Sequence, residues 1–363
     1  MLKSCSTALW DEYDVAMLDL DGVVYVGRAV VPGAAEHLSS AARSGMHLAY
    51  VTNNASRPPS EVAKHLRELG IPATDEDVVT SAQAAARLVA ELVPAGSAVF
   101  VIGGAGLFEA LAELDLKGVQ TIGEDPVAVV SGFNPDLIWQ TVIDGAILVS
   151  HGLPWVAANM DLTVPTAEGV GPGNGVLVSA VARFAGRDPV VAGKPEPPLF
   201  EETRRRVGGS HPLVVGDRLD TDIEGAENAG LDSLLVMTGV TGAEELAGAG
   251  SAGVGTGSRP SYISCDLGGL GTPHPLPVAL EEGGFSLNGW TGRVDKGVLA
   301  LDGEGSPDDW WRVMAVAAWQ HFDTTGSPAD VSGLSTPGSV STRAGLDTQE
   351  PRAGQREDGD SSE

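Results

Sequence analysis

The sequence has few of the features that mark secreted or membrane-spanning proteins. Only two cysteines occur in 363 residues, Cys5 and Cys265, and their separation fits neither a disulfide framework nor a metal-binding spacing. No apolar run reaches the roughly 18 residues that a membrane helix needs. The N-terminal stretch MLKSCSTALWDEYD lacks an apolar core of signal-peptide length. We therefore expect a reduced, soluble, cytoplasmic protein without a membrane partner.

Positive charge is also scarce. Lysine and arginine number 22 against 49 aspartates and glutamates, which gives a formal net charge of −27. Such a field repels phosphate backbones, so we expect no nucleic-acid partner. An anionic substrate would need a local positive site. Much of the excess charge is explained by an acidic surface that keeps the protein in solution.

Short apolar runs alternate with helical patterns in two blocks of the chain. Such alternation is typical of α/β folds with a parallel sheet, and we expect a doubly wound, Rossmann-like core built from residues 1–80 and 188–272. The expected strands are Val15–Leu18, His47–Val51, Val190–Ala192, Pro212–Val215 and Ser233–Met237. The expected helices are Gly33–Ser44, Ser60–Leu69, Leu199–Val207 and Ile223–Ala229, with a further helical turn at Ala243–Leu246.

A second α/β region, residues 81–187, lies between the two blocks. The simplest account is a domain inserted into the core, although a continuous second domain would give a similar pattern. Its expected strands are Val99–Ile102, Val127–Val130 and Ile147–Val149, and its expected helices are Ala82–Leu92 and Leu107–Leu114.

The last part of the chain changes in character. Residues 273–325 predict a small α+β extension with a hairpin of Phe285–Leu287 and Val298–Leu301. A helix is expected to follow, capped by Ser306. Its apolar stripe has the spacing of a packing surface and comprises Trp311, Met314, Ala315, Ala318, Trp319 and Phe322. Trp310 and Trp311 are expected to be exposed and hint at a homodimer. Gly, Ser, Thr, Pro and charges then predict a disordered tail at 326–363.

Four short stretches each follow a predicted strand. In an open parallel sheet, ligands bind outside the carboxyl ends of the strands, so these loops could converge on one crevice. Any one of them alone would be an ordinary turn. The stretches are DLDGV at Asp19–Val23, TNN at Thr52–Asn54, GKPEP at Gly193–Pro197 and GDRLDTD at Gly216–Asp222.

Together these loops could perform phosphoryl transfer. Asp19, Asp21 and Asp217 supply the oxygen ligands that Mg²⁺ prefers, and such a metal would explain how buried carboxylates stay ionised. Lys194 and Thr52 could hold phosphoryl oxygens, and the backbone after Gly22 could add N–H groups. Of the first two aspartates, one could attack phosphorus and the other protonate the leaving alkoxide.

The motifs DLDGVVYVG, TNN and GDRLDTDI resemble those of the haloacid dehalogenase-like (HAD) phosphatases. The resemblance covers about residues 14–270 and is closest to the IIA branch, which includes p-nitrophenylphosphatase, phosphoglycolate and glycerol-phosphate phosphatases. It implies Asp19 as nucleophile and Asp21 as general acid and base. It also implies that Thr52 and Lys194 bind the phosphoryl group, and Gly22, Asn53 and Asn54 are further candidates for phosphate binding.

The resemblance further implies that Mg²⁺ is held by Asp19, the backbone carbonyl of Asp21, and Asp217. Asp222 would lie behind them, where it fixes Lys194 or a metal-bound water. Residues 81–187 would form a cap of the larger α/β type (C2 type) that closes over the crevice. Within the stretch that returns from the cap, Asn159 and Asp161 could line the entrance, or they could be ordinary turn-forming residues.

The expected function is a Mg²⁺-dependent phosphatase for a small phosphorylated metabolite. Glycerol 3-phosphate is favoured because some glycerol-3-phosphate phosphatases of this branch carry a comparable C-terminal segment. The alternatives are 2-phosphoglycolate, a sugar phosphate or pyridoxal phosphate. A phosphotransferase that uses the same aspartyl-phosphate, and a binding module without activity, are rivals from other classes. The C-terminal segment resembles part of an acetyltransferase fold, but it is too short to be a complete one.

Overall fold

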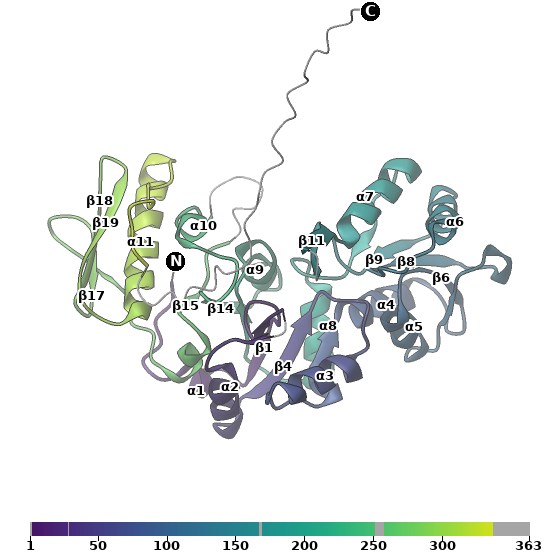
Figure 1. Ribbon diagram of the computed structural model, residues 1–363, viewed down its shortest axis with the longest axis horizontal. Helices are drawn as coiled ribbons and strands as arrows, with labels where there is room; N and C mark the ends of the chain where they lie inside the picture. The colour runs from purple at the N-terminus through teal and green to yellow at the C-terminus, as the bar shows by residue number, and fades with distance from the viewer. Residues whose placement is uncertain (1, 28, 167–168, 251–257, 337–363) are drawn as a thin grey trace, which may run out of the picture.

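The computed structural model describes residues 2–27, 29–166, 169–250 and 258–336. Within this part of the chain, a six-stranded parallel sheet lies in the middle (Figure 1). A five-stranded parallel sheet lies on one side of it and a four-stranded antiparallel sheet on the other. The fold is therefore the predicted α/β class with a Rossmann-like core.

The central sheet places the first strand of the chain in its middle. Its order is β15-β14-β13-β1-β4-β5, and every neighbouring pair is parallel. Leu18, the last residue of β1, lies opposite Val215 of β13 and Tyr50 of β4. The carboxyl ends of these strands therefore open at the same edge. The strands are β1 (Val15–Leu18), β4 (His47–Thr52), β5 (Val78–Thr80), β13 (Pro212–Gly216), β14 (Asp232–Val236) and β15 (Tyr262–Ser264).

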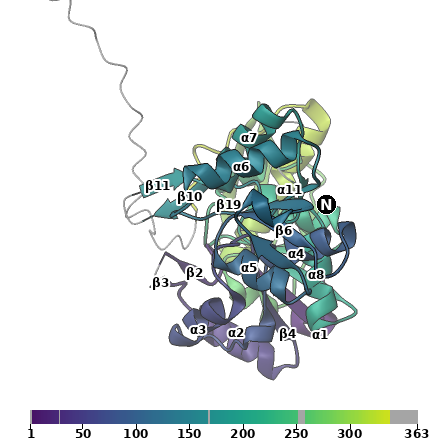
Figure 2. The same ribbon diagram turned by 90° about the vertical axis from the view of Figure 1, so that its right-hand side faces the viewer.

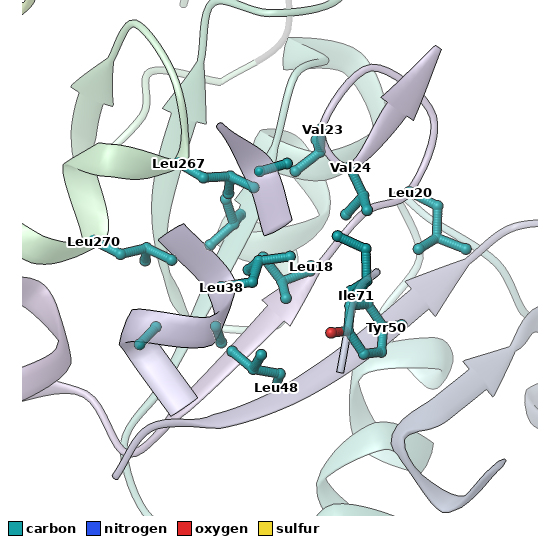
Figure 3. Packing of buried hydrophobic residues seen from close by; sticks show 14 of the residues in the cluster. Leu18, Leu20, Val23, Val24, Leu38, Leu48, Tyr50, Ile71, Leu267 and Leu270 are labelled. Carbon is teal, nitrogen blue, oxygen red and sulfur yellow. The ribbon is translucent and has the colours of Figure 1, made fainter. Parts of the chain in front are cut away.

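Both faces of the central sheet are buried, which explains why β1 is an unbroken apolar run rather than an alternating one. Leu18 and Tyr50 face the cluster in Figure 3, where Leu38 of α2 lies beside Leu18 and Ile71 beside Tyr50. Met17 and Val51 point the other way, toward Phe200 of α8. The helices beside this sheet are α1 (Leu9–Glu12), α2 (Ala34–Arg43), α3 (Pro59–Glu68), α8 (Pro198–Val207), α9 (Glu224–Asn228) and α10 (Ala243–Ala247).

The second sheet has the order β12-β9-β8-β6-β7. Alternate residues of β6 face opposite layers: Val99 and Val101 pack with α4 and α5, whereas Phe100 and Ile102 pack with α6 and α7. Figure 2 shows α6 and α7 side by side on their face. The strands are β6 (Ala98–Ile102), β7 (Lys117–Val119), β8 (Ala128–Ser131), β9 (Trp155–Ala157) and β12 (Val190–Val191). The helices are α4 (Ser81–Leu92), α5 (Ala105–Ala112), α6 (Trp139–Ser150) and α7 (Asn174–Ala185).

Two expectations for this region are corrected. Residues 147–149, expected as a strand, belong to α6, because their apolar run continues a helical repeat through Val142, Ala146 and Val149. Val190–Val191, expected in the returning core, pairs with β9 of the second sheet instead. The antiparallel pair β10 (Thr163–Thr166) and β11 (Gly169–Pro172) lies between β9 and α7 in the chain.

The C-terminal elements form a four-stranded antiparallel sheet with one long helix, α11 (Pro307–Thr325). The two strands expected to form a hairpin are present, but each pairs with β18, which lies between them in sequence. Ser306 caps α11 as predicted, since its hydroxyl accepts from the Asp309 backbone N–H at 3.1 Å. The strands are β16 (Val278–Ala279), β17 (Phe285–Leu287), β18 (Trp290–Asp295) and β19 (Val298–Gly303).

Two further expectations about the C-terminal region are wrong. Trp310 and Trp311 are buried at 2% and 6% exposure, so they are not a surface hint of a dimer. Residues 326–336 are ordered, because Ala329 and Val331 are buried and Asp330 pairs with the backbone of Leu299. The rest of the expected tail, 337–363, lies outside the described residues. In the described part of the chain, no helix is both long and apolar enough to cross a membrane.

Candidate active site

Lys194 lies at the centre of the crevice where the strand-end loops meet. Its Nζ donates to Asp19 Oδ1 at 2.5 Å and to Asp222 Oδ1 at 2.7 Å, with the carbonyl of Val51 at 3.3 Å. The side chain is 4% exposed, so these contacts replace water almost completely. The two carboxylates raise the pKa of the lysine against the lowering effect of burial. Lys194 is therefore a fixed positive charge inside an acidic molecule.

Asn53 couples the second loop to the third. Its Oδ1 accepts from the backbone N–H of Lys194 at 2.8 Å, and its Nδ2 donates back to the Lys194 carbonyl at 3.0 Å. A side-chain amide that pairs with both polar groups of one residue fixes the register between the two loops. The structure thus gives Asn53 a positioning role for Lys194.

Asp217 is fully buried after β13. Its Oδ2 accepts from the Val240 backbone N–H at 2.7 Å, whereas Oδ1 has no hydrogen-bond partner within the described residues. A buried carboxylate oxygen left unpaired is unfavourable unless a cation compensates it. Burial raises the pKa of Asp217 well above its usual value, and the charges of Asp222 and Asp19 raise it further.

Asp19, Asp217 and Asp222 each place a carboxylate oxygen within 4.8 Å of the others. Burial and the Asp222 charge raise the pKa of Asp19 to about 7, although the Lys194 charge opposes the shift. Three acids so close together, with one lysine among them, form an oxygen-rich site with excess negative charge. This donor set fits Mg²⁺, which prefers carboxylate, carbonyl and water oxygens.

Asp222 contacts Lys194 as expected, but the clustered acids differ in one respect from the expected ligand set. Asp222 lies within the cluster itself: its Oδ1 accepts from Lys194 and its Oδ2 from the Arg218 backbone N–H at 3.1 Å. The carboxylate of Asp21, in contrast, is not one of the three clustered acids. The expected contribution of Asp21 to a metal was its backbone carbonyl, which stays a prediction.

Asp21 is solvent-accessible, and the charges that act on it include those of Arg57 and His65, which the sequence motifs did not indicate. Desolvation by the surrounding protein raises its pKa, and the charges of Arg57, Lys194 and His65 lower it. The ring of His65 makes an edge contact with Tyr25 at 5.4 Å between centroids. Arg57 follows the TNN stretch by three residues, so proximity to that loop was the signal that could have found it.

Gly22 lets the first and fourth loops approach each other. Its φ is +87°, which favours glycine, and a Cβ there would lie 2.4 Å from Asp217 Oδ2. The hydroxyl of Thr238 donates to the Gly22 carbonyl at 2.6 Å. This position therefore needs glycine for both conformation and space.

The remaining predicted residues build the walls of the site. Thr52 is buried, and its Oγ1 accepts from the Asn54 backbone N–H at 3.1 Å. The Oδ1 of Asn54 is engaged by the backbone and hydroxyl of Ser56. Both therefore shape the second loop.

Asn159 and Asp161 contact the TNN loop, and they also form a turn, since Asn159 Oδ1 accepts from the Asp161 backbone N–H at 3.2 Å. Their expected role in lining the entrance stays a prediction. The Nδ2 of Asn159 donates to the Asn53 carbonyl at 2.6 Å, and Asp161 Oδ1 accepts from Asn53 Nδ2 at 3.1 Å. Burial raises the pKa of Asp161, and hydrogen bonding from Asn53 lowers it. The stretch that returns from the second sheet thus contacts the TNN loop directly.

Two family models match the chain. One, described as haloacid dehalogenase-like hydrolase, covers residues 16–117, and one described as HAD-hydrolase-like covers residues 191–268. These ranges include all four strand-end loops.

Curated relatives and solved structures agree with this match. The D-glycerol 3-phosphate phosphatase of Mycobacterium tuberculosis is 42% identical over 298 residues, which are 82% of this chain and 81% of that protein. A 5′-nucleotidase of Bacillus subtilis is 37% identical over 64% of this chain and 91% of its own length. The crystal structure of the M. tuberculosis glycerol phosphate phosphatase in complex with magnesium superimposes with a TM-score of 0.77 at 40% identity, over 86% of this chain and 92% of that one. This chain belongs to the haloacid dehalogenase-like hydrolase family, in its IIA branch of phosphatases.

Proposed function

We propose that this protein is a Mg²⁺-dependent phosphatase that hydrolyses glycerol 3-phosphate to glycerol and inorganic phosphate. The observation that carries the proposal is the buried lysine between Asp19 and Asp222, next to the unpaired oxygen of Asp217. A phosphate monoester is a dianion that needs positive charge on its oxygens and a nucleophile at phosphorus. This site offers both within one crevice.

Asp19 is the proposed nucleophile. Lys194 holds one of its carboxylate oxygens, which leaves the other to attack phosphorus while the ester P–O bond breaks. Asp21 gives a proton to the leaving alkoxide, and its carboxylate then takes a proton from water. The water oxygen attacks phosphorus, the bond to Asp19 breaks, and inorganic phosphate leaves.

Asp19, Asp217 and Asp222 are the carboxylates close enough together to hold Mg²⁺, with the Asp21 carbonyl as a further proposed ligand. When bound, the metal neutralises the acid cluster and draws charge from the phosphoryl oxygens. Lys194 and Thr52 bind phosphoryl oxygens in this proposal, with backbone N–H groups next to Gly22. Asn53 and Asn54 keep the second loop in place, and Asn159 and Asp161 close the site from the returning stretch.

The choice of glycerol 3-phosphate rests on the C-terminal part of the chain. The relative named for that substrate is matched over 298 residues, whereas the 5′-nucleotidase is matched over 236. The longer match supports a protein that shares the C-terminal extension as well as the catalytic loops. The division into a core (1–80 and 188–272), an inserted cap (81–187) and an extension from 273 is part of this proposal. Cytoplasmic location and a homodimer stay predictions.

A steady-state screen with and without Mg²⁺ tests the substrate. We expect glycerol 3-phosphate to give the highest kcat/KM among 2-phosphoglycolate, a sugar phosphate, pyridoxal phosphate and a nucleoside 5′-monophosphate, and EDTA to abolish turnover. If glycerol 3-phosphate ranks well below any of them, the substrate proposal is wrong. Phosphate release that depends on an added acceptor alcohol would indicate a phosphotransferase instead.

Replacing Asp19 by Asn tests the nucleophile. We expect kcat to fall by about a thousandfold or more, because an amide cannot form the covalent intermediate. Asp220→Asn is the matched control, since Asp220 lies on the fourth loop, is 39% exposed and pairs with Arg218. Nearly normal activity of Asp19→Asn, with Asp220→Asn equally active, would contradict the mechanism.

A further inference from the structure

The loop that follows β14 encloses Asp217 on several sides. Val240 N–H donates to Asp217 Oδ2 at 2.7 Å, and the Thr241 hydroxyl donates to the Asp217 carbonyl at 2.6 Å. Thr238 holds the carbonyl of Gly22. A Cβ on Gly239 would overlap the same carboxylate. The direction of the unpaired Asp217 Oδ1 is therefore set by residues 238–241.

The helix α10 begins immediately after this loop, at Ala243. The backbone N–H of Gly242 is capped by Glu245 at 2.9 Å, and Leu246 N–H bonds the Gly242 carbonyl at 3.0 Å. A shift of α10 would therefore move the loop to which it is joined.

The C-terminal helix α11 holds α10 from outside the catalytic core. The indole N–H of Trp319 donates to the Leu246 carbonyl at 2.8 Å in a buried contact. Trp319 is 2% exposed and Leu246 is fully buried, so water cannot replace this bond. At the C-terminal end of α10, the Leu246 carbonyl also accepts from the backbone N–H of Ala249 at 3.2 Å.

Arg259 strengthens the same contact. Its guanidinium lies 5.2 Å from the centre of the Trp319 ring and forms a two-bond pair with Asp323, at 2.7 and 2.9 Å. Its Nε also donates to the Ala249 carbonyl at 3.0 Å. Two side chains of α11 thus fix the end of α10 and the residues after it.

We propose that Trp319 is a positioning residue for the metal site: through α10 and residues 238–241 it fixes Asp217, so that the C-terminal extension sets the affinity for Mg²⁺. This inference rests on the proposed function, because it assumes that Asp217 is a metal ligand. In this inference the C-terminal extension supports the phosphatase activity and does not carry a second activity of its own.

The test compares Trp319→Phe with Trp310→Phe. Both indoles are buried in one hydrophobic cluster on α11, but nine positions separate them, which places them about half a turn apart around the helix. Mg²⁺ dissociation constants are measured by isothermal titration calorimetry, at a temperature where circular dichroism shows both variants folded. We expect Trp319→Phe to weaken Mg²⁺ binding about threefold to tenfold, the range that loss of one hydrogen bond allows, and Trp310→Phe to leave it unchanged.

A double-mutant cycle tests whether Trp319 acts on Asp217 through α10 and residues 238–241. Thr241→Val should weaken Mg²⁺ binding by itself, and its effect should be smaller in the Trp319→Phe background, because both changes release the same loop. Asp323→Asn is a milder second variant if Trp319→Phe does not fold.

Equal Mg²⁺ affinities for the Trp319 and Trp310 variants, or fully additive effects with Thr241→Val, would overturn the inference. Wild-type protein that neither binds Mg²⁺ nor hydrolyses phosphate esters would instead refute the proposed function.

Discussion

Gly22 shows how closely the site is packed, because it meets two separate demands. A side chain there would need an unfavourable φ of +87°, and its Cβ would also overlap the carboxylate of Asp217. Neighbouring Gly27 has a comparable φ of +60° but nothing within 4 Å of a Cβ. Substituting each glycine in turn therefore distinguishes the cost of backbone strain, expected at both positions, from displacement of Asp217, expected only at Gly22.

We predict that Gly22→Ala destabilises the fold by about 1–3 kcal/mol, the usual range for a strained residue, and also abolishes most Mg²⁺-dependent activity. Gly27→Ala should show only the strain. Urea unfolding and steady-state kinetics on both variants check this. Retained activity in Gly22→Ala would mean that Asp217 does not need its present position.

The spacing of the motifs indicated which residues form the site, but it did not indicate most of the contacts between them. Asp19, Thr52 and Asp217 lie at the carboxyl ends of β1, β4 and β13, which share one edge of the central sheet. Lys194 also reaches Asp19, although β12, the strand before it, belongs to the second sheet. The sequence did not indicate Arg57 near Asp21, since a lone arginine in a loop has no periodic pattern. It also gave no sign that Asn53 would bond both backbone groups of Lys194, a contact between residues 141 positions apart.

Among the elements, the first strands and helices of the central sheet were predicted most reliably, whereas helices α6 and α7 were not expected. The capped start of α11 was correct because Ser306 and Pro307 act locally. The strand expected at residues 147–149 was wrong, since a short apolar run fits a buried strand and a helix equally well. The hairpin partners were wrong because β18, which lies between the two strands in sequence and pairs with both, was not expected as a strand. Pairing between strands depends on tertiary packing that no local pattern contains.

The contact between α11 and the core includes a buried histidine. His274 Nε2 bonds the Gly269 carbonyl at 2.8 Å, which makes it the donor, so Nδ1 accepts from Arg312 at 3.1 Å. Burial and the Arg312 charge lower the pKa of His274 to about 4. The neutral form is therefore the one that the fold requires. Other groups that face this ring are Tyr262, Asp308 and Asp309.

A lowered histidine pKa makes the fold acid-sensitive. Below about pH 6.5 the unfolded chain takes up a proton that folded His274 refuses until about pH 4, so stability falls as the pH drops through this window. The full effect is about 3 kcal/mol. We predict that His274→Gln flattens this part of the curve of unfolding free energy against pH, measured in urea.

The exposed His151, changed to Gln, serves as the control for that experiment. It should leave the pH dependence of unfolding as it is in the wild type. Parallel curves for the wild type and His274→Gln between pH 6.5 and 4 would show that another group is responsible.

For the whole molecule, the charge of −27 acts in opposite directions on the two ligands of the proposed reaction. It attracts Mg²⁺ and repels a phosphate dianion, and salt screens both effects. We predict that raising KCl from 20 to 200 mM weakens Mg²⁺ binding and lowers the KM of the phosphate ester at saturating Mg²⁺, each by about a few-fold. Titration calorimetry and initial rates measure the two effects. If the Mg²⁺ dissociation constant and the KM of the ester both rise or both fall with salt, the overall charge does not control them.

The central position of β1 also has a consequence for biosynthesis. This strand lies between β4, which follows it closely, and β13, which begins almost two hundred residues later. At a typical pace of about 5–20 residues per second, the ribosome needs on the order of 10–40 seconds to supply that second neighbour. Until then the nascent chain holds Asp19 without Asp217, so under the proposed mechanism an unfinished polypeptide is not expected to hydrolyse its substrate.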